Sequence, residues 1–171
     1  VVDAERQWSK HGIVPVTVGV AESVTPFSFE PYKGASTVER VVEQRKGQDF
    51  FRRAVLANFD NRCCVTGIAE PQLLNASHIL PWKFDVEHRH NPANGLAMSA
   101  TFDRAFDRGL ISFDENRRLI LSHSLTSHPD RTTRNHFSAY QGEEMAGTRR
   151  FEPSSKFLAW HRANIFRGLD R

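Results

Sequence analysis

Four side chains in one stretch of the chain have types and spacing suited to acid–base and metal chemistry. His78 ends a short apolar run, and Asn94 lies in a turn marked by proline and glycine. Asp103 and Asp107 are at i and i+4 of a helix-like stretch, so their carboxylates share one face and can hold a hard divalent cation. An imidazole with an ordinary pKa of about 6.5 can accept a proton from water near neutral pH. This set is suited to metal-assisted hydrolysis.

A short strand, a loop and a helix must position these groups. The apolar run at residues 73–79 has strand length, and Pro81 closes it because proline removes a ladder donor. The helix is expected to begin near Ser99, whose type suits an N-cap, and to stop at Gly109. We therefore predict an α+β fold, with a two-stranded sheet and a helix between about Leu73 and Arg108 and with further helices around them.

Several motifs in this region occur in a recognisable order. They are Cys63-Cys64-Val65-Thr66-Gly67, Ala76-Ser77-His78-Ile79-Leu80-Pro81, Asn94-Gly95-Leu96 and Phe106-Asp107-Arg108-Gly109-Leu110. With these motifs the chain resembles the HNH endonucleases of the ββα-metal superfamily. Residues 45–52 and 157–162 fit the same branch, so the resemblance extends from near Thr37 to the end of the chain.

The resemblance implies a ββα-metal core with flanking helices and an additional β-hairpin. It implies a metal-dependent endonuclease that hydrolyses DNA phosphodiester bonds, as the nuclease module of a restriction or defence protein. In this assignment His78 is the general base, and the cation binds Asp103 with help from Asp107. Asn94 braces the loop that orients His78, although in some relatives an asparagine binds the metal.

Two positions depart from the family pattern. Asp103 stands where the third motif letter is a histidine, and carboxylate ligands favour Mg²⁺ over softer ions, with Mn²⁺ or Ni²⁺ as alternatives. Ser77 stands where many members have a ligating Asp or His, so water, Asp107 or another oxygen must complete the site. These departures leave open a catalytically decayed HNH-fold module that binds nucleic acid, and also a structural-metal protein.

Basic side chains near the motifs are candidates for phosphate contacts, although each could equally be solvated. The nucleic-acid-binding candidates are Lys83, Arg89, His90, Arg104 and Arg108. Asp107 also has a second interpretation, in which it pairs with Arg108 or caps local backbone. His161 is a lone histidine beside an apolar stripe, for which a structural role is favoured over catalysis.

Composition sets the broad class of the protein. The chain has 171 residues, 39% hydrophobic content and a net charge of +3, which suits one mildly basic globular domain. It contains no apolar run of membrane-spanning length, so we expect a cytoplasmic protein. The adjacent Cys63 and Cys64 are expected to be reduced, with Cys64 buried, and no structural zinc is expected. We expect double-stranded DNA as the partner, and a homodimer stays open.

The remaining segments complete the expected organisation. Residues 1–36 are either an arm or linker, the remnant of an upstream recognition domain missing before Val1, or a strand that completes the core, with an edge strand near residues 13–20. Residues 37–171 form the HNH domain. Its expected flanking elements are a helical region at 37–58 broken at Gly47, a hairpin of 110–113 and 118–121, loops at 122–151, and a last helix after 152–154.

Overall fold

The computed structural model describes residues 38–84 and 87–168, with side chains described from Gly47 onward. These residues belong to one compact unit, Ser36–Arg171. The expected arm at residues 1–36 and the edge strand near residues 13–20 lie outside the described residues. No helix in the described ranges is long and apolar enough to cross a membrane.

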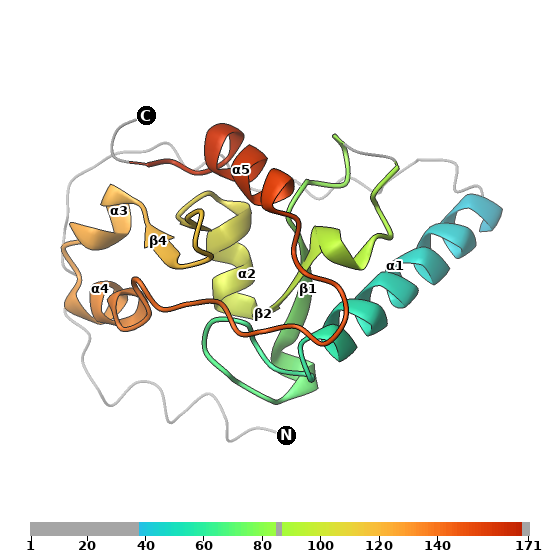
Figure 1. The fold of residues 1–171 in the computed structure, drawn as a ribbon, viewed down its shortest axis with the longest axis horizontal. Coiled ribbons are helices and arrows are strands. Elements are labelled where there is room, and N and C mark those ends of the chain that lie inside the picture. Colours follow the sequence, from blue (N-terminus) through green and yellow to red (C-terminus); the bar gives the residue numbers. More distant parts are fainter. Residues whose placement is uncertain (1–37, 85–86, 169–171) are drawn as a thin grey trace, which may run out of the picture. The chain divides into compact units, whose positions relative to one another are not determined.

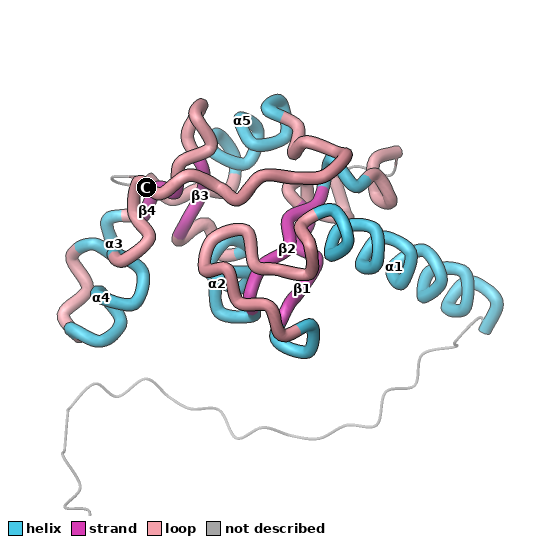
Figure 2. The backbone as a smooth tube through the Cα atoms, turned by 60° about the horizontal axis from the view of Figure 1, so that its bottom comes forward, coloured by secondary structure: helices cyan, strands magenta, loops and turns pink. Residues whose placement is uncertain are grey.

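The centre of the fold is an antiparallel two-stranded sheet followed by a helix. Strand β1 (Leu74–His78) pairs with β2 (Gly95–Ser99), and helix α2 (Ala100–Asp107) follows directly. Figure 1 shows this sheet between α2 and the long helix α1 (Val38–Asn58), and Figure 2 shows the same order from another side. Both helices contact both strands. The predicted α+β fold with its ββα centre is confirmed.

The ends of α2 follow from its sequence. Ser99 adopts the extended backbone of an N-cap, although its side chain makes no cap hydrogen bond. At the other end Gly109 has φ +69°, and the amides of Gly109 and Leu110 donate to the carbonyls of Phe106 and Ala105. A Cβ at Gly109 would also collide with the backbone oxygen of Ile165. Glycine is therefore required at this helix end.

Helix α1 is continuous, so the predicted break at Gly47 is wrong. A Cβ at this position would collide with the imidazole ring of His90. Glycine at this position therefore lets the His90 ring approach the backbone of α1 closely. The helix tolerates the glycine, which costs about 1 kcal/mol relative to alanine. Further along α1, Phe51 and Val55 are buried against the sheet, where Gly95 leaves room for both side chains.

The predicted β-hairpin is confirmed. Strand β3 (Ile111–Phe113) pairs with β4 (Leu119–Leu121) in antiparallel register. Asp114 Oδ1 accepts hydrogen bonds from the amides of Asn116 and Arg118, at 2.8 Å each, and Arg117 has φ 60°. The carboxylate thus closes the polar turn between the strands.

Residues 122–151 were expected to be loops, and this expectation is wrong. They contain the short helices α3 (His123–Thr126) and α4 (Arg131–Ser138). Each buries a single side chain, Leu125 in α3 and Phe137 in α4, so neither shows a broad apolar stripe in the sequence. Asp130 caps α4 by accepting from the Thr133 amide at 2.6 Å. The last helix, α5 (Ser155–Asn164), occurs where it was predicted.

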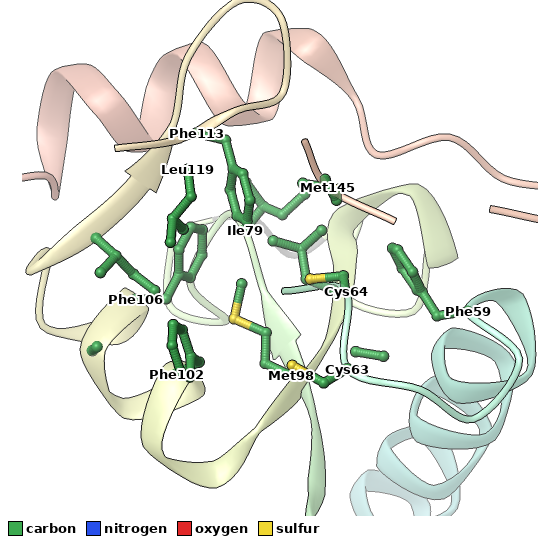
Figure 3. Close-up of a cluster of buried hydrophobic side chains, with 14 of the residues drawn as sticks. Phe59, Cys63, Cys64, Ile79, Met98, Phe102, Phe106, Phe113, Leu119 and Met145 are labelled. Atoms are coloured by element: carbon green, nitrogen blue, oxygen red, sulfur yellow. The ribbon is translucent and has the colours of Figure 1, made fainter. Parts of the chain in front are cut away.

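The hydrophobic core joins the ββα centre to the hairpin. Figure 3 shows Phe102 and Phe106 of α2 beside Leu119 and Phe113, with Met98 of β2 near them. Cys63 and Cys64 are free and buried in the same cluster, as expected for small apolar residues. Burial holds the pKa of the Cys64 thiol well above its usual value. The thiols therefore contribute packing in this fold.

Candidate active site

His78 is held in an aromatic environment at the end of β1. Its ring stacks on Phe51 of α1, with centroids 3.9 Å apart and planes 9° from parallel. The indole of Trp82 meets the imidazole edge-on at 5.6 Å and 88°. Desolvation by these neighbours lowers the pKa of His78, the nearby His90 lowers it further, and a hydrogen bond to the Arg89 carbonyl acts in the opposite direction. The imidazole therefore stays neutral at neutral pH.

The hydrogen bond of His78 determines which ring nitrogen is basic. Nε2 lies 2.8 Å from the carbonyl oxygen of Arg89. A carbonyl can only accept, so we assign the proton to Nε2, and Nδ1 keeps its lone pair. His78 thus has one nitrogen held by the loop and one that keeps a lone pair.

Asn94 ties together the loop that follows β1. The residue is fully buried, and its Oδ1 accepts from the Leu80 amide at 2.8 Å. Its Nδ2 donates to the carbonyls of Leu80 and His88, at 3.3 Å each. The Asn94 amide therefore links the main chain of Leu80 to that of His88, one residue before Arg89, whose carbonyl contacts His78.

The two aspartates of α2 lie one turn apart and line the same pocket as His78. Asp103 Oδ2 accepts a hydrogen bond from Asn75 Nδ2 at 2.7 Å. The pKa of Asp107 is raised by desolvation and by the charge of Asp103, against the opposing effect of two neighbouring arginines. Within the described residues Asp107 makes no ion pair, so the alternative pairing with Arg108 does not occur.

The pocket is open and has a volume of about 820 Å³. It collects side chains from α1, β1, α2 and the loop after β1. The predicted site residues on its lining are His78, Lys83, Asp103, Arg104, Asp107 and Arg108. The fold thus brings a base, two carboxylates and several cations around one concave space.

Arg89 and His90 do not line this pocket. The Arg89 guanidinium lies 4.8 Å from the Trp82 ring centroid, and its Nε donates to the Trp82 carbonyl at 2.9 Å. The His90 ring contacts the Trp82 edge at 5.4 Å and lies against Gly47. The Arg89 side chain therefore packs within the loop and the His90 ring packs between Trp82 and α1, while the contact of Arg89 with His78 comes from its backbone carbonyl.

Comparison with known proteins identifies the central region. Residues 63–114 match the family model described as HNH endonuclease. These residues are therefore assigned to the HNH endonuclease family. This confirms the resemblance inferred from the motifs, and the matched residues include β1, β2, α2 and the start of the hairpin.

Solved structures also show similarity to the chain. No curated protein matches the chain. A solved structure entitled "Modification dependent TagI restriction endonuclease" is similar over 67% of this chain, at 16% sequence identity and a TM-score of 0.48. The similar region spans 37% of that protein, so this chain corresponds to little more than a third of its length.

Strand β1 carries two further residues on the pocket lining, Ser77, which the motif comparison had noted, and Asn75, which the sequence did not single out. Ser77 is 3% exposed, lines the pocket, and its Oγ has no hydrogen-bond partner among the described residues. Asn75 lies two residues earlier, on the same face of the strand, and bonds Asp103. Because successive strand residues alternate between faces, the position of His78 in the predicted strand could have placed Asn75 and Ser77 together on the opposite face.

These residues fit a hard divalent cation. The described residues contain no group of three or more His, Cys, Asp and Glu that could hold a metal. Asp103 and Asp107 supply carboxylate oxygens, and Ser77 Oγ, which has no partner among the described residues, is a buried oxygen on the lining of the same pocket. An all-oxygen set of this kind suits Mg²⁺, which keeps several waters and binds few protein ligands.

His161 lies outside the HNH site. It is 2% exposed and stacks on Phe106, with centroids 3.7 Å apart. Its Nδ1 is 2.9 Å from Ser112 Oγ, and its Nε2 is 3.2 Å from the Phe106 carbonyl. Burial lowers its pKa to about 4. His161 is a structural histidine, as the sequence favoured.

Proposed function

We propose that this chain is a metal-dependent DNA endonuclease in which His78 is the general base. The observation that carries the proposal is the hydrogen bond from His78 Nε2 to the Arg89 carbonyl. It leaves Nδ1 basic on a side chain that lines the same pocket as Asp103 and Asp107. The lowered pKa of His78 keeps this nitrogen unprotonated at neutral pH.

The reaction follows from these groups. His78 Nδ1 accepts a proton from a water molecule whose oxygen attacks the phosphorus. A new P–O bond forms as the bond to the 3′ oxygen breaks, which gives a 5′-phosphate, and the leaving 3′ oxyanion takes a proton from solvent water to become the 3′-hydroxyl. A divalent cation held by Asp103 and Asp107 supplies charge stabilisation for the phosphate and the leaving oxygen.

The loop after β1 keeps the base in place during this step. Asn94 fixes the main chain of Leu80 and His88, and the Arg89 carbonyl then holds the imidazole. Phe51 stacks on one face of the ring and restricts its movement in that direction. A base that is already oriented loses little freedom on reaching the transition state, so these contacts favour turnover.

Double-stranded DNA is the proposed substrate. Lys83, Arg104 and Arg108 line the pocket and make no ion pair with any described residue. Their positive charges are therefore available to phosphates on either side of the scissile bond, and DNA binding should weaken with salt. From the motif resemblance we also propose that the protein has a role in restriction or defence and that a separate domain recognises its target.

The direct test is plasmid nicking by the full chain with Mg²⁺, Mn²⁺ or Ni²⁺. Wild type should nick, and His78→Ala should not. His123→Ala is a matched control, because His123 is exposed on α3 and does not line the pocket. DNA binding by wild type without nicking in any of these ions would favour the alternative, a catalytically decayed HNH-fold binding module.

A further inference from the structure

One contact in the pocket joins β1 directly to the carboxylate of α2. Asn75 Nδ2 donates to Asp103 Oδ2 at 2.7 Å, although the two residues come from different elements. An amide N–H that donates to a charged carboxylate makes one of the stronger hydrogen bonds in proteins. The contact therefore restricts how the Asp103 side chain can turn.

A second, independent feature indicates that a ligand belongs beside this contact. Ser77 is on the same face of β1 as Asn75, because successive residues of a strand alternate between its faces. Its hydroxyl oxygen is buried, lines the pocket and has no partner among the described residues. Buried polar atoms are almost always satisfied, so this oxygen marks a place where a bound group is expected.

We propose that Asn75 is a positioning residue for the cation site. Its side-chain amide occupies one carboxylate oxygen of Asp103 and leaves the other for the cation. This inference rests on the proposed function, in which Asp103 binds a divalent ion. Asn75 acts through Asp103 and touches neither the scissile phosphate nor the attacking water.

The consequence is an effect on metal affinity that exceeds any effect on folding. Asn75 is exposed on the strand, so its replacement leaves no cavity in the core. Without the amide, Asp103 is free to turn away, and ordering it again costs part of the binding free energy. Loss of a residue that orients a metal ligand typically weakens affinity by about 10–100-fold, and an exposed contact should lie near the lower value.

The experiment measures Mn²⁺ binding to the full chain without DNA, from the electron paramagnetic resonance signal of free Mn²⁺. Asn75→Leu keeps the side-chain size and removes the donor, and it should weaken Mn²⁺ binding about tenfold. Gln72→Leu is the matched control, because Gln72 is an exposed amide on the segment before β1 and does not line the pocket. It should bind Mn²⁺ as wild type does.

Further variants distinguish a failure of the role of Asn75 from a failure of the proposed function. Asp103→Ala should bind Mn²⁺ more weakly than Asn75→Leu, and wild type that binds no Mn²⁺ would overturn the proposed function itself. Wild-type affinity in Asn75→Leu, with weak binding in Asp103→Ala, would overturn only the role of Asn75. Asn75→Ala repeats the measurement with a smaller side chain, and thermal unfolding in EDTA checks that both variants are folded. A tenfold loss with an unchanged midpoint supports a positioning role.

Discussion

The imidazole of His78 lies flat against the phenyl ring of Phe51, with the ring centroids 3.9 Å apart. Phe51 belongs to α1, which precedes the ββα centre in the chain, so an element outside that centre forms one wall of the site. The ring is 2% exposed and excludes water from one face of the imidazole. Desolvation is the largest cause of the lowered pKa of His78.

Replacing Phe51 should therefore change the pH dependence of cleavage. In wild type the acid limb of the rate should lie below pH 6.5, because a base with a lowered pKa stays unprotonated to lower pH. Phe51→Leu admits water, so the pKa should rise and the acid limb should move to higher pH. The measurement is nicking rate against pH. Phe50→Leu, at an exposed neighbouring position, should leave the profile unchanged.

His78→Ala should lose cleavage and keep DNA affinity. The proton transfer occurs in the transition state, so its loss lowers turnover by roughly 10²–10⁴-fold with little effect on binding. Gel-shift affinity and nicking rate, measured across a salt series, separate the two quantities. A variant that bound DNA much more weakly, yet cleaved normally at saturation, would show that His78 is a contact residue.

Asp103→Ala and Asp103→His should differ in their use of metals. Alanine removes a carboxylate ligand, so metal-dependent nicking should be abolished while the protein stays folded. Histidine restores the residue type of the family motif, and imidazole favours transition metals over Mg²⁺. The ratio of nicking in Ni²⁺ to nicking in Mg²⁺ should therefore rise in Asp103→His. Wild-type cleavage by Asp103→Ala would place the cation elsewhere.

His161 should make stability depend on pH. Its pKa is about 4 in the folded protein and about 6.5 when unfolded, so the unfolded state binds more protons between these values. The free energy of unfolding should fall by about 3 kcal/mol as the pH drops from 6.5 to 4. Urea unfolding of wild type and His161→Leu should show this component only in wild type. Equal pH dependence in both would assign the effect to other groups.

The ββα centre could be predicted because its signals are local. The apolar run before Pro81, the N-cap type of Ser99 and the left-handed glycine at position 109 each act within a few residues. The short polar helices could not be predicted, because each is stabilised by tertiary packing. Phe137 of α4, for example, packs against Phe102 of α2 with centroids 5.1 Å apart.

The residue types of the site were determined by the sequence alone, as the motif match at residues 63–114 bears out for the family. Their surroundings were decided only by tertiary structure. Charge suggested that the Arg89 side chain contacts phosphate, whereas folding places its carbonyl on His78 and its guanidinium on Trp82. The sequence shows which groups can do chemistry. Hydrogen bonds and ring contacts between distant segments form only when those segments pack together. These contacts decide which atoms stay free to react.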